Sequence, residues 1–315
     1  MISAIVVSYQ AIDVLKQCLD KLIAALGAWD HQIIVVDNST DESALRLGRL
    51  YPDIDWIVNQ ANVGFAVASN QGAANARGEW LLFVNPDLMI NEHAIRFMLE
   101  TANEHPECGC FGPRIESPTG RIEKTCNRHL PGLRAAWRSL FGLGARSMYR
   151  RDSGPVPCLS GACFLVKRVT FEEVSGFDPS LPLYLDDMDL FWRLGQQGEP
   201  LQFVNEAVVQ HVGGASVSQL PNPRMTSLMR VIAFDRAFAK RRQAVRRFVH
   251  RASLGLFACF AVLLEVLALF PATCFGRTKW VLNWLRLHAS MLCLCATGRF
   301  ASRQLPANWP RHFLG

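Results

Sequence analysis

Acidic residues and one histidine follow predicted strands at several places in the chain. The stretch Trp80–Leu88 reads WLLFVNPDL, in which a short apolar strand runs directly into Asn85 and Asp87. An earlier apolar strand ends at Asp37, and a later one ends at His211. Carboxylate oxygens and a neutral imidazole at strand ends suit a hard divalent cation that carries a diphosphate, although Asn-Pro-Asp is also an ordinary turn sequence.

A second group of carboxylates lies within residues 184–193, which read YLDDMDLFWR. Asp186, Asp187 and Asp189 repel one another, so their proximity is costly unless a cation or a helix N-terminus compensates them. The apolar residues that follow have the spacing of one helix face, which predicts a helix that begins near Asp187. Asp187 then lies at the start of this helix, where a general base can stand, whereas Asp189 is equally well explained as a helix cap.

The elements around these residues predict an α/β fold. Strands at 4–8 and 32–36 flank a helix at 11–26, and this βαβ unit has parallel strands with a right-handed crossover. A third strand at 54–58 precedes a helix at 65–76 that is rich in small residues. Further along, the patterns predict a helix at 92–104, a hairpin within 114–130 that turns at 118–120, a strand at 159–166, a short helix at 171–177 and strand segments that end before His211.

Several function classes receive little support from the sequence. No GxGxxG follows a predicted strand and no GxxxxGK[ST] occurs, which disfavours a dinucleotide-binding fold and a P-loop. The ten cysteines are scattered and lack the spacing of zinc knuckles, so we expect reduced cytosolic thiols. The net charge of +6 is concentrated between Arg236 and Arg251. Without a base-reading motif, this run favours an anionic membrane surface over nucleic acid.

The C-terminal third predicts helices at a membrane. Residues 224–251 suit a basic amphipathic helix, and residues 252–270 are almost wholly apolar except for Glu265. A second apolar segment at 280–297 contains Arg286 and His288. Because a carboxylate in the middle of a membrane span is costly, we favour interfacial or re-entrant helices. The alternatives are a spanning hairpin in which Glu265 faces Arg286, and an ordinary soluble helical hairpin.

Together, six strings within residues 2–216 resemble family 2 glycosyltransferases with the GT-A fold, and more narrowly the bacterial rhamnosyltransferase-like branch that builds polysaccharides. The strings are VVSYQ, VVDNSTDES, NVGFAVASNQGAANARGEWLLFVNPDL, SGACFLVKR, GFDPSLPLYLDDMDLFWRLGQQG and QHVGGAS. The resemblance implies a nucleotide-diphospho-sugar transferase with a Rossmann-like mixed sheet and a C-terminal helical, membrane-associated extension. The corresponding domains are 1–220 for the transferase, 221–251 for the basic linker helix and 252–315 for the apolar hairpin.

Individual roles follow from this resemblance. Asp37 is expected to contact the nucleotide base and Asp187 to act as catalytic base. Asp87 and His211 are expected to hold Mg²⁺ or Mn²⁺. Here the DxD motif of the family is changed to Asn85-Pro86-Asp87, so the first acid is missing, and the ED pair is changed to Asp186-Asp187. The further positions expected to bind the donor are Ser8, Asn62, Gly64, Asn70 and Asn85, although helix packing explains Gly64 and Asn70 nearly as well.

The resulting expectation is an inverting transferase on the cytoplasmic side of the inner membrane. The favoured donor is dTDP-rhamnose and the acceptor is a saccharide linked to polyprenyl diphosphate. A UDP-sugar donor and a non-catalytic sugar-nucleotide-binding assembly subunit remain as alternatives. A processive synthase is disfavoured because the QAVRR sequence at 243–247 lacks the tryptophan of the QxxRW motif of those enzymes.

Overall fold

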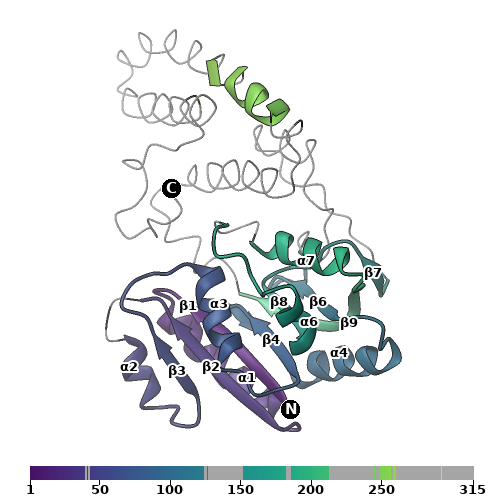
Figure 1. The fold of residues 1–315 in the computed structure, drawn as a ribbon. Coiled ribbons are helices and arrows are strands. Elements are labelled where there is room, and N and C mark those ends of the chain that lie inside the picture. Colours follow the sequence, from purple (N-terminus) through teal and green to yellow (C-terminus); the bar gives the residue numbers. More distant parts are fainter. Residues whose placement is uncertain are drawn as a thin grey trace. The chain divides into compact units, whose positions relative to one another are not determined.

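The computed structural model describes residues 1–39, 41, 43–123, 126, 152–181 and 186–212, and in the C-terminal part residues 245, 248–256, 258, 259 and 292. The chain divides into two compact units. Unit 1 consists of Met1–Leu130 and Ala145–Pro221, and unit 2 of Pro131–Gly144 and Asn222–Gly315. Every residue predicted to do chemistry belongs to unit 1. Figure 1 labels the helices and strands of this unit.

Nine strands and six helices are described in unit 1. The strands are β1 (Ile2–Ser8), β2 (His31–Asp37), β3 (Asp55–Val58), β4 (Trp80–Val84), β5 (Leu88–Met89), β6 (Cys110–Glu116), β7 (Gly154–Val156), β8 (Cys163–Lys167) and β9 (Leu201–His211). The helices are α1 (Ile12–Leu26), α2 (Ser43–Gly48), α3 (Phe65–Ala74), α4 (Glu92–Glu104), α6 (Arg168–Glu173) and α7 (Asp186–Gln196).

The strands form one mixed sheet in the order β3-β2-β1-β4-β8-β6-β9-β5, with β7 also paired to β9. Strands β3, β2, β1 and β4 are parallel, β8 is antiparallel to both β4 and β6, and β6 is parallel to β9. The first four strands therefore end at one edge of the sheet. Since β8 runs in the opposite direction, it begins at that same edge.

Hydrophobic periodicity accounts for the helices that cover this sheet. Helix α1 buries Leu15, Leu19 and Leu22, which recur at the spacing of one helix face. Helix α4 starts at Asn91, whose side-chain oxygen accepts a hydrogen bond from the backbone N–H of Ala94 at 2.9 Å. Strands β1, β2 and β4 are buried along almost their whole length, as expected for parallel strands covered on both faces.

A cluster of aromatic rings connects the two halves of the sheet. The ring of Phe83 on β4 stacks on that of Phe164 on β8, with centroids 4.7 Å apart. Phe83 also contacts Phe171 of α6 at 5.2 Å and Phe177 at 5.5 Å. These contacts fix α6 and the loop after it against the junction of the parallel and antiparallel strands.

The structure confirms the predicted mixed α/β sheet and most of its elements, including the helix at 92–104 and the helix that begins near Asp187. The hairpin is also present, with a bridge between Glu116 and Ile122. The largest differences in boundaries concern two elements. The predicted strand at 159–166 begins only at Cys163, and the predicted helix at 171–177 instead spans Arg168–Glu173, directly after β8. The short elements α2, β5 and β7 were not predicted.

The predicted C-terminal helices lie almost entirely outside the described residues. Residues 248–256 are helical, and Phe248 and Leu256 there are 73% and 75% exposed. Glu265, Arg286 and His288 fall outside the part of the chain that the structure describes. Within the described part, helices long and apolar enough to cross a membrane are absent.

The aromatic cluster gives a test of the fold. Replacing Phe83 by alanine removes its contacts with three other rings and leaves a cavity, so the free energy of unfolding should fall by about 3–5 kcal/mol. Urea denaturation followed by circular dichroism measures this loss. The matched control is Phe97→Ala. Because Phe97 is 37% exposed, this substitution should lower the free energy of unfolding by less than about 1 kcal/mol. Equal losses in the two variants would contradict the assignment of Phe83 to the core.

Candidate functional site

The carboxyl ends of the parallel strands bring several of the predicted site residues together. Ser8 at the end of β1 is paired with Asp37 at the end of β2, and the N–H of Asn38 donates to the Ser8 carbonyl oxygen at 2.8 Å. Strand β4 lies on the other side of β1 and leads directly to Asn85. The strand ends of an open α/β sheet are where such folds bind ligands.

Asp37 is buried at this edge. One carboxylate oxygen, Oδ1, accepts a hydrogen bond from the Ser39 hydroxyl at 2.9 Å, and that hydroxyl in turn accepts from the backbone N–H of Gln10 at 2.8 Å. The other oxygen, Oδ2, is buried and has no hydrogen-bond partner among the described residues. Burial raises the pKa of Asp37, and the hydrogen bonds from Ser39 lower it in part. A ligand that donates an N–H to Oδ2 would supply the missing partner.

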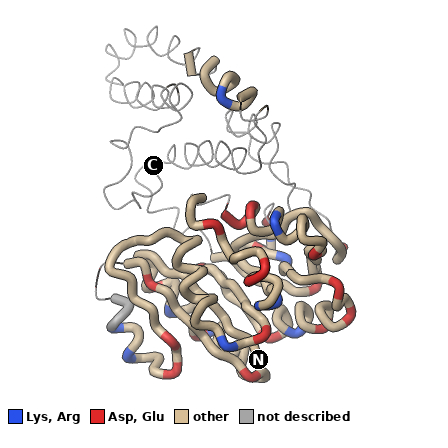
Figure 2. Tube along the Cα trace, viewed as in Figure 1, with Lys and Arg blue, Asp and Glu red and all other residues tan. Residues whose placement is uncertain are grey.

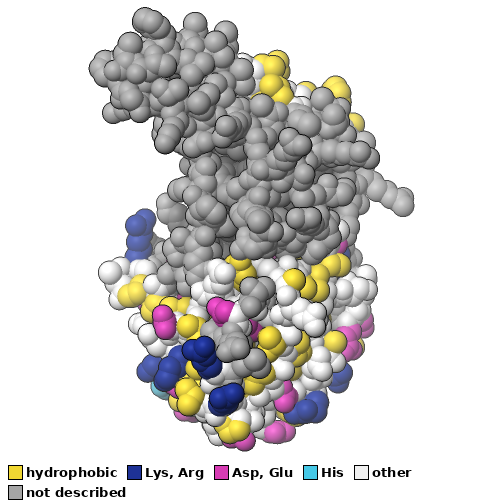
Figure 3. All heavy atoms as spheres, turned by 90° about the vertical axis from the view of Figure 1, so that its left-hand side faces the viewer, with side chains coloured by type: hydrophobic (Ala, Val, Ile, Leu, Met, Phe, Trp, Pro, Cys, Tyr) yellow, Lys and Arg dark blue, Asp and Glu magenta, His cyan; other side chains and the backbone are white. Residues whose placement is uncertain are grey.

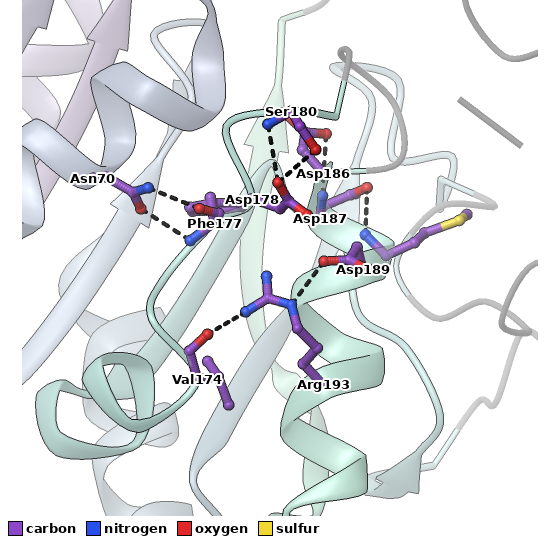
Figure 4. Close-up of polar contacts among 10 residues, drawn as sticks. Asn70, Val174, Phe177, Asp178, Ser180, Asp186, Asp187, Asp189 and Arg193 are labelled. Atoms are coloured by element: carbon purple, nitrogen blue, oxygen red, sulfur yellow. Dashed lines mark hydrogen bonds and ion pairs between the residues drawn. The ribbon is translucent and has the colours of Figure 1, made fainter. Parts of the chain in front are cut away.

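Three of the predicted donor-binding residues make contacts that shape the loops around the edge. The Asn62 side chain accepts from the N–H of Gly64 at 2.9 Å, and Gly64 has a φ of 85°, which favours glycine. The Asn70 amide makes two hydrogen bonds with the backbone of Phe177, at 2.8 and 2.9 Å (Figure 4). These contacts stabilise the fold, and the role of these residues in donor binding stays a prediction.

Asp87 and His211 lie side by side, although 124 positions separate them in the sequence. Strand β5 pairs with the end of β9 so that Leu88 is opposite His211, and the N–H of Val212 donates to the Asp87 carbonyl oxygen at 3.0 Å. The His211 Nε2 atom is 3.2 Å from Asp87 Oδ2. On the other side of the ring, His211 Nδ1 is 2.7 Å from Glu123 Oε1. Sequence reasoning missed Glu123.

The two carboxylates control the charge of this histidine. Burial lowers the pKa of His211, but the hydrogen bonds to Asp87 and Glu123 outweigh burial and raise the pKa to about 10. Without a cation, the ring is therefore protonated at neutral pH and compensates both carboxylates. A divalent cation bound between Nε2 and Asp87 would take the place of the Nε2 proton.

The start of helix α7 holds Asp187. The Oδ2 atom of Asp187 accepts a hydrogen bond from the N–H of Gly161 at 3.1 Å. Its Oδ1 atom accepts from the N–H of Met188 at 2.8 Å (Figure 4). A Cβ atom on residue 161 would lie 2.5 Å from the Cβ of Asp187, so only glycine allows this approach. The backbone N–H groups of Gly161 and Met188 thus fix the position of the carboxylate.

The neighbouring acidic residues are compensated by other groups. Figure 2 shows acidic residues close together around the start of α7. Asp189 forms an ion pair with Arg193 at 2.7 Å, and Arg193 also donates to the Val174 carbonyl oxygen. Asp178 accepts hydrogen bonds from the N–H and hydroxyl of Ser180 at 2.9 and 2.8 Å. Asp189 therefore has a structural role in fixing α7 through Arg193, and its role as a helix cap stays a prediction.

A short loop links Asp187 to the end of β4. Gly161 contacts Asp187 as described, and the carbonyl oxygen of the next residue, Ala162, accepts a hydrogen bond from the N–H of Asn85 at 2.8 Å. Asn85 in turn precedes Asp87 by two positions. The carboxylate at the start of α7 and the Asp87–His211 pair are thus held at the same edge of the sheet.

Comparison with known proteins shows which family this chain belongs to. The model of the family described as glycosyl transferase family 2 matches residues 3–175, which is more than half of the chain. The chain belongs to glycosyl transferase family 2. It is 30% identical over 229 residues to N-acetylglucosaminyl-diphospho-decaprenol L-rhamnosyltransferase of Mycobacterium tuberculosis, a match that covers 64% of this chain and 74% of that relative. The reaction class is therefore glycosyl transfer from a nucleotide-sugar donor.

Solved structures of glycosyltransferases share the GT-A-like fold. The mannosyltransferase PcManGT from Pyrobaculum calidifontis, in complex with GDP-Man and Mn²⁺, aligns with a TM-score of 0.53 at 16% identity. The alignment covers 94% of this chain and 85% of the PcManGT chain. GalNAc-T7 with UDP, GalNAc and Mn²⁺ aligns with a TM-score of 0.53 at 16% identity. That alignment covers 67% of this chain but 43% of GalNAc-T7. At this level of identity the likeness establishes the fold alone.

The raised pKa of His211 predicts a pH dependence of stability. An unfolded histidine has a pKa of about 6.5, so the stabilisation from protonated His211 is fully present below that pH and is lost as pH rises to about 10. In EDTA, the difference in unfolding free energy between wild type and His211→Asn should therefore shrink between pH 6.5 and 10. Urea denaturation of both proteins at several pH values measures this difference in free energy.

The control for this pH dependence is His105→Asn. His105 also lies near a carboxylate, at 3.2 Å from Glu107, but both side chains are exposed. This variant should keep the pH dependence of the wild type. A difference between wild type and His211→Asn that stays constant across the same pH range would contradict the assigned protonation of His211.

Proposed function

We propose that this chain transfers L-rhamnose, or another deoxyhexose, from a dTDP donor to a saccharide linked to polyprenyl diphosphate, with inversion at the anomeric carbon. The observation that carries the proposal is the meeting of Asp37, Asp87, His211 and Asp187 at one edge of the sheet. The name of the mycobacterial relative, a rhamnosyltransferase on a decaprenyl-diphosphate-linked sugar, supports the choice of donor sugar and acceptor.

Asp37 suits recognition of the nucleotide base. Its buried Oδ2 atom lacks a hydrogen-bond partner within the described part of the chain, and the N3–H of thymine or uracil is a donor that would satisfy it. This contact does not distinguish a dTDP-sugar from a UDP-sugar, so a UDP-sugar donor remains the alternative. Ser8 and Asn85 lie at the same strand ends and are the further residues that we assign to the donor.

The donor atoms of Asp87 and His211 fit a divalent cation. The 3.2 Å between Asp87 Oδ2 and His211 Nε2 is close to the ~3 Å between adjacent ligand atoms of an octahedral ion with bonds of about 2.1 Å. Clusters of three or more histidine, cysteine or acidic side chains suited to a metal are not found among the described residues, so diphosphate oxygens and water would complete the coordination. Bound Mg²⁺ or Mn²⁺ would neutralise the leaving diphosphate.

Asp187 is the catalytic base in this proposal. Its carboxylate is held by backbone N–H groups at the start of α7, and the loop of Gly161 and Ala162 links it to the residues that follow β4. Asp187 accepts the proton of an acceptor hydroxyl as that oxygen attacks the anomeric carbon from the face opposite the diphosphate. One displacement of this kind inverts the carbon and requires no covalent enzyme intermediate.

Residues 245 and 248–256 of unit 2 support an acceptor at a membrane surface. Their helical backbone exposes three large apolar side chains, Val245, Phe248 and Leu256, each more than 70% exposed. Figure 3 shows hydrophobic side chains of unit 2 at the molecular surface. Such side chains beside arginine suit insertion at the interface of an anionic membrane. We therefore propose that the chain works on the cytoplasmic side of the inner membrane.

A panel of nucleotide sugars tests the proposed reaction. The purified full chain in detergent is supplied with a polyprenyl-diphosphate-linked acceptor and with dTDP-, UDP- or GDP-sugars, in Mn²⁺, Mg²⁺ or EDTA. We expect metal-dependent release of dTDP from dTDP-rhamnose together with transfer to the lipid. Release from UDP-sugars alone would overturn the rhamnose assignment. If calorimetry finds that a donor binds but neither release nor transfer occurs, the alternative of a non-catalytic sugar-nucleotide-binding assembly subunit replaces the enzyme.

If Asp187 is the catalytic base, its substitution should lower turnover but leave binding of the donor almost unchanged. Asp187→Asn keeps the size of the side chain but removes its basicity, so kcat should fall by about 10²- to 10⁴-fold. The Kd for the donor, measured by calorimetry, should change by less than about threefold. The matched variant is Asp186→Asn, in which the side-chain oxygen can still accept from the N–H of Asp187. Its kcat should fall much less than that of Asp187→Asn. If Asp186→Asn caused the larger loss, the base would have to be reassigned.

A further inference from the structure

Glu123 lies where three separate segments of unit 1 meet. After β6 the chain turns at residues 117–120, and the N–H of Glu123 donates to the carbonyl oxygen of Ile115 at 2.8 Å. This returning arm runs beside the end of β6, which is itself paired with β9 so that Glu116 is opposite Gln210. The Glu123 side chain thereby reaches the last residue of β9, His211.

The two ring nitrogens of His211 face two different carboxylates on opposite sides of the ring. Nε2 faces Asp87, the proposed metal ligand, at 3.2 Å, whereas Nδ1 faces Glu123 at 2.7 Å. Glu123 is on the side of the ring away from Asp87, so it is not placed to share a cation with it. The side chains of His211 and Glu123 are 18% and 28% exposed, which limits competition from water for this contact.

From this geometry we propose that Glu123 is a positioning residue that prepares His211 to bind the catalytic cation. By accepting a hydrogen bond from Nδ1, Glu123 fixes the plane of the ring, keeps the Nδ1 proton in place and leaves Nε2 as the atom that meets the metal. A carboxylate behind a metal-binding histidine also makes the ring a stronger ligand. The inference rests on the proposed function, because it assumes a cation between Asp87 and His211.

A carboxylate–histidine pair elsewhere in unit 1 provides a comparison. His105 and Glu107 are separated by 3.2 Å, but both side chains are exposed, at 44% and 61%, and they are two positions apart on one surface loop. Glu123 and His211 are 88 positions apart, and the hairpin and the β6–β9 pairing are both needed to bring them together. The Glu107 carboxylate therefore serves as a control that has the same chemistry outside the site.

Mn²⁺ binding to the full chain, measured by electron paramagnetic resonance, tests the role of Glu123. Glu123→Ala should weaken Mn²⁺ binding by about 10- to 100-fold, and Glu123→Gln, which can still accept from Nδ1 but carries no charge, should lie between alanine and wild type. Glu107→Gln should bind as the wild type does. Circular dichroism checks that each variant is folded. A folded Glu123→Ala that binds Mn²⁺ as tightly as the wild type would overturn the inference.

A double-mutant cycle separates positioning from a general effect on charge or folding. His211→Asn removes Nδ1, so adding Glu123→Ala to this variant should change Mn²⁺ affinity by less than about twofold. If Glu123→Ala costs as much in this background as in the wild type, Glu123 acts on the metal directly or through the fold, and the inference fails. If His211→Asn itself leaves Mn²⁺ binding unchanged, the proposed metal site fails before Glu123 is considered.

Discussion

Burial of carboxylates at one edge of the sheet is the constraint on which the rest of the structure depends. Asp37, Asp87 and Asp187 are each less than 10% exposed, and an ionised carboxylate in such a place is stable only if N–H groups, hydroxyls or a cation compensate it. Each is compensated by a different element: a hydroxyl of the loop after β2 for Asp37, the His211 ring at the end of β9 for Asp87, and backbone N–H groups at the start of α7 for Asp187. The sheet must hold these elements in register before the site can form.

The change of strand direction at β8 is what allows the carboxylate of α7 to join the strand ends. Because β8 is antiparallel to β4, Val84 at the end of β4 is opposite Cys163 at the beginning of β8. The residues that precede β8 therefore lie next to those that follow β4, and Gly161 and Ala162 contact Asp187 and Asn85 from there. A fifth parallel strand in this position would have begun at the opposite edge and left α7 without this link.

The sequence was informative where a local pattern decides the structure. Helix α4 was predicted at its observed bounds, and the structure shows that it begins at an Asn91 cap and buries one apolar face. The strand-end positions of Asp37, Asp87 and His211 were predictable because each follows a buried apolar run. Glu123 was not, since its contact with His211 depends on a hairpin turn and on the pairing of β6 with β9, neither of which leaves a mark on residue 123 itself. The two-residue strand β5 has no periodicity to detect.

Asn85 stands where the family resemblance places the first acid of the DxD motif, and this difference has a consequence for charge. Without a cation, the carboxylates of Asp87 and Glu123 and the protonated His211 ring carry one net negative charge. A divalent cation in place of the Nε2 proton makes the group neutral, whereas a further carboxylate at residue 85 would leave it negative. A neutral centre repels the diphosphate of the donor less, but it also holds the cation less strongly before the donor arrives. On the proposed mechanism, cation and nucleotide sugar therefore bind with positive coupling, each improving the affinity for the other.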